Sequence, residues 1–123
     1  MQYLLLIYLP ESQWETLAAP EKQKIYGQYR ELIGDLQNTG KYLGGHELQP
    51  TTTATTVRVR SGKKTVTDGP FAETKEQLGG YFLVEAKDLD CAINIASQIP
   101  GVRRGTVEIR PVIEIPDQPT NEK

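Results

Sequence analysis

The side chains best suited to chemistry in this chain are one imidazole and a set of charged groups in one long connection. His46 is the only histidine, and histidine is the side chain whose unperturbed pKa lies near neutrality. A general base of this kind needs a carboxylate to orient it, and Asp68 and Glu73 are candidates. We therefore take His46 and Asp68 as candidate catalytic residues. The alternative is a partly exposed strand histidine without a chemical role.

Residues 68–80, DGPFAETKEQLGG, form the connection that carries most of these charges. The segment joins two predicted strands with far more residues than a hairpin turn needs, and long ordered connections are commonly functional. Its first three residues have turn chemistry. Thr74 and Gln77 have the spacing of a capping box, which predicts a short helical turn that begins at Thr74.

This loop also supplies candidate ligand-binding groups. Phe71 is an apolar anchor in its middle, and Lys75 suits an anionic group. We expect a pocket between the loop and the sheet, with ligand contacts from Phe71, Glu73, Thr74, Lys75 and Tyr81. The alternative is a structured Ω-loop that covers an edge of the core and keeps its charges in water.

Three further features have simpler interpretations. Cys91 is expected in the first turn of a helix as an ordinary small residue. Trp14, the only tryptophan, is either a lid over the edge of the core or the wall of a pocket. A basic cluster is either a solvated strand edge or a site for an acidic partner; it consists of Arg58, Arg60, Lys63 and Lys64.

Composition limits the class of protein. The chain has 123 residues, which favours one domain, and its formal charge of −2 argues against a non-specific nucleic-acid binder. One cysteine and one histidine exclude an internal disulfide and a Cys/His zinc site, and no metal site is expected. The apolar run 3–8 is too short to span a bilayer, so we expect no membrane association and a cytoplasmic location.

Hydrophobic periodicity predicts strands and helices in the order β-α-β-(β-β)-β-α-β. The predicted strands cover residues 2–8, 41–48, 55–60, 64–67, 80–86 and 106–115, and the predicted helices cover 20–38 and 89–99. The second helix has Asp88 as its N-cap and a buried stripe that includes Leu89. This order predicts an α+β protein with a ferredoxin-like split βαβ fold and an inserted hairpin.

Two of these strands, residues 2–8 and 80–86, are apolar on both faces. Two helices cover only one face of a sheet, and the sequence predicts no third helix. A second copy of the chain, packed sheet to sheet, would cover the other face. We therefore expect a homodimer.

Several segments together resemble a known family. They are DGPFAETKEQLGGY at 68–81, MQYLLLIY at 1–8, TTVRVR at 55–60, DLD at 88–90 and GTVEIRP at 105–111. The chain resembles the DGPF group of YCII-related proteins over residues 1–115, with 68–81 as the most specific motif. The resemblance implies a single domain over 1–115 in a dimeric α/β-barrel arrangement. Residues 117–123 are polar and have no hydrophobic period, so we predict a disordered tail over 116–123.

The resemblance implies less about activity. YCII-like proteins are suspected enzymes because of a His–Asp pair in a pocket, but their histidine lies near the first helix, whereas His46 follows it here. Similarity to proteins encoded beside extracytoplasmic-function sigma factors implies a regulatory link. The first hypothesis is a small-molecule enzyme without a cofactor that uses a pocket under the 68–80 loop. The alternative is a non-catalytic ligand-binding or regulatory partner linked to a sigma factor.

Overall fold

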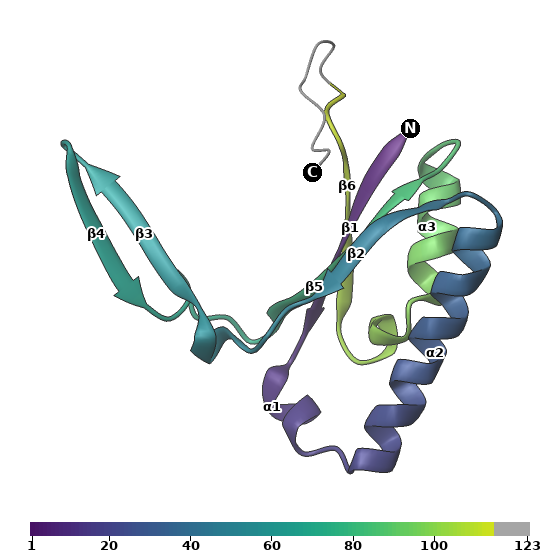
Figure 1. Cartoon of the computed structure of the whole chain (residues 1–123), viewed down its shortest axis with the longest axis horizontal. Coiled ribbons are helices and arrows are strands. Elements are labelled where there is room, and N and C mark those ends of the chain that lie inside the picture. The colour runs from purple at the N-terminus through teal and green to yellow at the C-terminus, as the bar shows by residue number, and fades with distance from the viewer. Residues whose placement is uncertain (115–123) are drawn as a thin grey trace.

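The computed structural model describes residues 1–114, and the tail predicted over 116–123 lies outside them. Figure 1 shows the course of the chain. The helices are α1 (Glu11–Glu15), α2 (Ala19–Asn38) and α3 (Leu89–Gln98), with 3-10 turns η1 (Thr51–Thr53) and η2 (Pro100–Arg103). The strands are β1 (Gln2–Leu9), β2 (Tyr42–Glu47), β3 (Thr55–Arg60), β4 (Lys63–Asp68), β5 (Gln77–Glu85) and β6 (Thr106–Pro111).

Four strands form the main sheet in the order β2-β5-β1-β6, and all neighbours are antiparallel. Numbered by their place in the chain, these strands have the order 2-3-1-4, which is compatible with a ferredoxin-like split βαβ fold. The α+β class predicted from the sequence is therefore confirmed.

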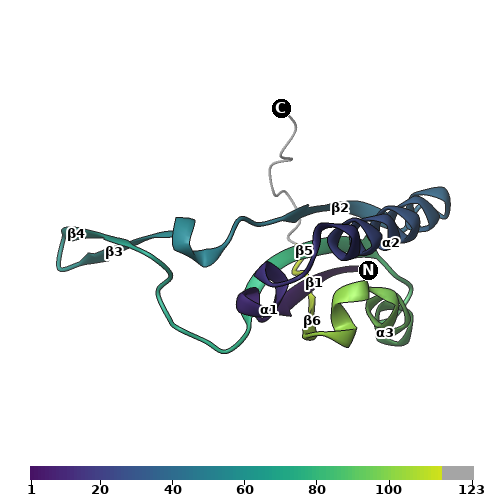
Figure 2. The same ribbon diagram turned by 90° about the horizontal axis from the view of Figure 1, so that it is seen from below.

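The inserted hairpin, β3–β4, is a separate two-stranded sheet. Both views show it standing away from the main sheet (Figures 1 and 2). Val57 pairs with Val66 across the hairpin.

The core lies on one face of the main sheet. On β1 the side chains of Tyr3, Leu5 and Ile7 are buried, and the alternate residues are only partly buried. Both long helices pack onto this face and complete one hydrophobic cluster; their buried contributions are Leu32, Leu36, Ala92, Ile95 and Ala96. Leu89 is a correction to the predicted stripe, because it lies in the first turn of α3 and is 50% exposed.

Local signals define the ends of the helices. Pro20 lies in the first turn of α2, where a missing N–H does no harm. After α2, Gly40 adopts a positive φ of 70°, and the Lys41 amide donates to the Leu36 carbonyl at 2.8 Å. The N-cap of α3 is as predicted: the Asp88 carboxylate accepts a hydrogen bond from the Cys91 amide at 2.9 Å.

The short helical turn predicted at Thr74 is wrong. The Thr74 hydroxyl donates to the Glu76 carbonyl, and Gln77 begins β5, where it pairs with Leu9 of β1. Strand pairing uses Gln77, and a helix starting at Thr74 would have to break it. The sheet contacts therefore override the local capping signal.

Among residues 1–114, no helix lies on the opposite face of the main sheet. Its apolar side chains are partly exposed, and they are Leu4, Leu6, Tyr8, Tyr81 and Leu83. We call this set the open face. Within residues 1–114, no helix combines the length and hydropathy needed to cross a membrane.

Candidate functional site

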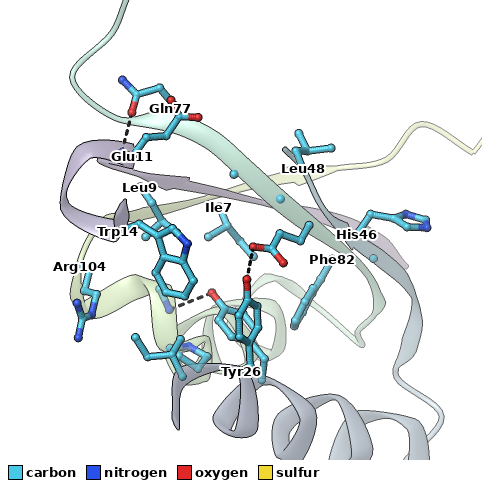
Figure 3. A pocket seen from close by; sticks show the side chains of 18 of the residues that line it. Ile7, Leu9, Glu11, Trp14, Tyr26, His46, Leu48, Gln77, Phe82 and Arg104 are labelled. Carbon is cyan, nitrogen blue, oxygen red and sulfur yellow. Dashed lines mark hydrogen bonds between the residues drawn. The ribbon is translucent and has the colours of Figure 1, made fainter. Parts of the chain in front are cut away.

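A cavity of about 360 Å³ lies between the helix-covered face of the sheet, α1 and α2. Figure 3 shows the side chains around it. Aromatic and aliphatic groups from five elements form most of its wall, among them Trp14, Tyr26, Tyr29, Leu48 and Phe82. A concave apolar site with a few polar groups is the usual form of a small-molecule site.

The aromatic wall follows from helical spacing. Tyr26, Tyr29 and Ile33 are three or four residues apart, so they share one side of α2. Trp14 of α1 meets Tyr26 edge to face, with ring centroids 5.5 Å apart. Tyr29 meets Phe82 of β5 in the same way at 6.1 Å. These edge-to-face contacts hold α1, α2 and the sheet around the cavity.

Glycine brings edge strand β2 close to β5 beside the cavity. A Cβ atom at Gly45 would lie 2.7 Å from the Tyr81 carbonyl oxygen and 2.7 Å from the Tyr42 hydroxyl. The register of β2 also shifts between Tyr42 and Gly44, which marks a bulge in the strand.

Glu47 provides a carboxylate at this wall. Its Oε2 atom accepts a hydrogen bond from the Tyr26 hydroxyl at 2.9 Å, which joins β2 to α2. Burial and this hydrogen bond raise the pKa of Tyr26 above its ordinary value of 10.0, so the phenol is held as a donor. Burial also raises the pKa of Tyr29, and the charge of Glu47 adds to that rise. Glu47 therefore acts electrostatically on two tyrosines of the cavity.

Glu11 ties the rim of the cavity to the root of the hairpin. Its two carboxylate oxygens accept from the Thr51 hydroxyl at 2.7 Å and the Thr51 amide at 2.8 Å. The Glu11 amide donates to the side-chain oxygen of Gln77 at 2.9 Å. One residue of α1 thus holds both ends of the segment that contains β3 and β4. In residues 1–114, no group of three or more His, Cys, Asp or Glu side chains is placed to hold a metal ion.

His46 is among the residues that line the cavity, but its ring lies on the other side of the sheet. Its neighbours Gly45 and Glu47 line the cavity, and alternate residues of a strand point to opposite faces. The His46 Nδ1 atom forms a hydrogen bond with the Tyr81 hydroxyl at 2.9 Å. Figure 3 shows the His46 ring turned away from the aromatic side chains. The structure thus brings together two predicted site residues, His46 and Tyr81, on the open face.

The other predicted site residues stay apart from this pair in a single chain. Asp68 ends β4 and is exposed, and no hydrogen bond or ion pair within residues 1–114 joins it to His46. Phe71 is 78% exposed. Glu73, Thr74 and Lys75 are exposed as well. Their catalytic and ligand-binding roles remain predictions, and the cavity described above has a different wall.

The sequence analysis missed Glu47 and Tyr26 as a pair. The sequence contains a pattern that points to each residue. Tyr26 widens the apolar stripe of its helix, and Glu47, two residues after Gly45, lies on the same face of the strand as Gly45. The pairing itself depends on how α2 crosses β2, which periodicity does not encode. For Trp14, the pocket-wall interpretation is the one that the structure supports.

Comparison with known proteins identifies the family. The YCII-related domain matches residues 1–116. An uncharacterized protein of Rhizobium meliloti (strain 1021) is 34% identical over 114 residues, which cover 91% of this chain and 92% of that protein. The chain therefore belongs to the YCII-related family, as the resemblance of its motifs implied. Assignment to the DGPF group stays a prediction.

Proposed function

We propose that the chain binds a small molecule with an apolar, flat body in the cavity between α1, α2 and the sheet. The observation that carries this proposal is the Glu47–Tyr26 hydrogen bond at the wall of an aromatic cavity of about 360 Å³. Apolar walls supply affinity, and a few placed polar groups fix the orientation of a ligand. The same carboxylate and phenol would serve acid–base chemistry on a bound substrate without a cofactor.

The cavity favours small-molecule binding over the regulatory link to a sigma factor. A concave cavity of about 360 Å³ with aromatic walls has the size and lining of a small-molecule site. The site proposed here also differs from a pocket under the 68–80 loop, because the exposed side chains of Glu73 and Lys75 are not part of its wall.

Two leucines with similar exposed fractions test whether ligands bind in this cavity. Leu48 lines the cavity and is 43% exposed, whereas Leu43 is 45% exposed and is not part of the wall. A thermal-shift screen of flat aromatic compounds would supply ligands, and calorimetry would measure their binding. We expect Leu48→Trp to abolish binding by filling the cavity and Leu43→Trp to retain it. Equal effects of the two variants, or a screen without any stabilising compound, would contradict the proposal.

The loop hypothesis is tested by the same ligands. Asp68→Asn and Lys75→Ala change the two loop residues with the clearest predicted roles. The cavity proposal expects both variants to bind with unchanged affinity. A loss of binding in either one, together with full binding by Leu48→Trp, would move the site to the loop.

We also propose that two copies pack through their open faces in the dimeric α/β-barrel arrangement. Support comes from Leu4, Leu6 and Leu83, which remain partly exposed beside the covered face. Burial of such surface contributes roughly 25 cal/mol per Å². Leu6→Glu should give a monomer in light scattering, while Leu89→Glu, on the exposed side of α3, should leave a dimer. A wild-type protein of monomer mass at micromolar concentration would refute this arrangement.

A further inference from the structure

The free oxygen of Glu47 bears on which ligands the cavity selects. Oε2 is occupied by the Tyr26 hydroxyl, but Oε1 accepts no hydrogen bond from residues 1–114. The Tyr26 hydroxyl donates to Oε2 at 2.9 Å, as a phenol that is protonated at neutral pH can. The open position on this carboxylate is therefore an acceptor, and it fits a ligand group that donates.

The charges around the cavity favour a positive group. Its charged lining consists of Glu11, Glu15, Glu47, Arg30 and Arg104, a formal charge of −1. Each carboxylate oxygen of Glu11 already accepts one hydrogen bond from Thr51. The guanidinium of Arg104 points away from the aromatic side chains in Figure 3. Glu47 is thus the charged group with an established contact to the aromatic wall.

The aromatic rings favour the same ligand class. The ammonium of Lys22 lies 5.6 Å from the centroid of the Trp14 ring, so a cation–π contact on this ring is made within the protein, and a ligand ammonium would be placed by Glu47 rather than by Trp14. The edge-to-face pair of Trp14 and Tyr26 stands beside the Glu47 carboxylate. Electron-rich rings next to a carboxylate are the combination that recognises organic cations.

We infer that the ligand has an apolar or aromatic body and a protonated amine that binds Glu47. This inference rests on the proposed cavity site and names the ligand class for it. A carboxylate ligand of the same shape would be repelled by Glu47, and an alcohol would donate a hydrogen bond to it without the added attraction of an opposite charge.

Three probes of one skeleton test the ligand class. They are 2-phenylethylamine, 2-phenylethanol and 3-phenylpropionate, which carry a cation, a neutral donor and an anion. Binding is followed by calorimetry and by the fluorescence of Trp14, which is the only tryptophan and lines the cavity. We expect the amine to bind about tenfold more tightly than the alcohol, and the carboxylate to bind most weakly.

Charge-removing variants isolate the role of Glu47. Glu47→Gln should bring the affinities for amine and alcohol together, while Glu15→Gln, which removes a charge elsewhere on the wall, should keep the preference for the amine. Equal binding of amine and alcohol by the wild type, tightest binding of the carboxylate, or no binding of the amine would overturn the ligand class. The cavity itself fails if Leu48→Trp and Leu43→Trp affect the binding of screened compounds equally or if the screen finds none.

A second inference concerns the hairpin, which we call the arm (residues 55–68). Val57, Val59 and Val66 share one face of it and are 58%, 58% and 57% exposed. An isolated two-stranded hairpin is marginally stable in water, so an exposed row of valines indicates a surface that another molecule covers.

Charge is separated between the arm and the rest of the chain. The arm contains four basic residues and one acidic residue, a formal charge of +3; Arg58, Arg60 and Lys63 lie on the face opposite the valines, and Lys64 lies on the valine face. Since the whole chain has a formal charge of −2, the remainder carries −5. The arm stands away from its own body in both views (Figures 1 and 2), so the acidic surface that complements it must come from elsewhere.

We infer that the arm docks on a second copy of this chain, whose body supplies the complementary negative charge. The test replaces Val57, Val59 and Val66 by threonine, which preserves the β-branched shape. Sedimentation should give the threonine variant a dimer dissociation constant at least about tenfold higher than that of the wild type. The dissociation constant of the wild type should rise with salt concentration. Serine at Thr65 and Thr67, on the other face of the arm, is the control. A wild-type monomer, or unchanged dimerisation of the threonine variant, would overturn the inference.

Discussion

Glu11 and Thr51, 40 residues apart, are joined by two hydrogen bonds, one to each carboxylate oxygen. The contact connects α1, which carries Trp14 at the cavity, to the 3-10 turn at the base of the arm. The two proposed binding surfaces, the cavity and the arm, therefore share one structural connection.

Glu11→Ala should loosen the base of the arm. The Thr51 amide loses its acceptor, so its hydrogen exchange should become faster, while the amides inside β1 keep their protection. Hydrogen exchange followed by NMR measures both. Glu15→Ala, in the same helix, removes a carboxylate without a hydrogen-bond partner in residues 1–114 and serves as the control. Equal exchange rates at Thr51 in the two variants would show that the contact does not hold the arm.

Gly45→Ala should destabilise the protein by about 1–3 kcal/mol, because the added methyl group meets the backbone oxygen of Tyr81 at 2.7 Å. Gly44→Ala is the matched control, since a Cβ atom there has no neighbour within 4 Å. We expect its effect to stay within about 0.5 kcal/mol. Urea unfolding measures both, and equal midpoints would mean that β2 moves freely enough to absorb the clash.

Glu47→Gln should lower the pKa of Tyr26, because it removes the negative charge that disfavours the tyrosinate. The raised pKa of Tyr26 also determines in which direction stability changes with pH. Its contribution to stability is present in full below pH 10.0, the ordinary value, and is lost as the pH rises through the higher folded value. NMR titration of the tyrosine ring carbons measures the pKa, with Tyr26→Phe to assign the signal. A pKa for Tyr26 that Glu47→Gln leaves unchanged would refute the electrostatic contact.

Asp88 should give α3 an acid-sensitive N-cap. The hydrogen bond from the Cys91 amide lowers the pKa of Asp88 below its ordinary value of 3.8. Its contribution to stability is therefore present in full above pH 3.8 and is lost as the pH falls through the lower folded value. Asp88→Asn keeps a capping oxygen but removes the titration, and Asp88→Ala removes both. We expect thermal unfolding at neutral pH to rank the wild type and Asp88→Asn above Asp88→Ala. Identical acid sensitivity of wild type and Asp88→Asn would refute the role of the carboxylate.

The sequence by itself determined the secondary structure that positions the site. Apolar alternation in residues 2–8 and 80–86, helical spacing over 20–38 and the Asp88 cap are local patterns, and each corresponds to an element of the structure. The α+β class follows from the order of these elements. At Thr74 the local pattern was misleading, since pairing of Gln77 with Leu9 prevailed over the capping signal.

Tertiary structure alone decided which side chains meet. His46 and Glu47 are neighbours in the chain, yet the pleat of β2 sends one toward Tyr81 on the open face and the other toward Tyr26 at the cavity. The sequence singled out His46 because of its pKa, which is a property of one residue. The cavity is a property of packing: it depends on where α2 crosses β2 and on the edge-to-face contact of Trp14 with Tyr26. Local periodicity carries no information about such distances, because they arise from contacts between segments far apart in the chain.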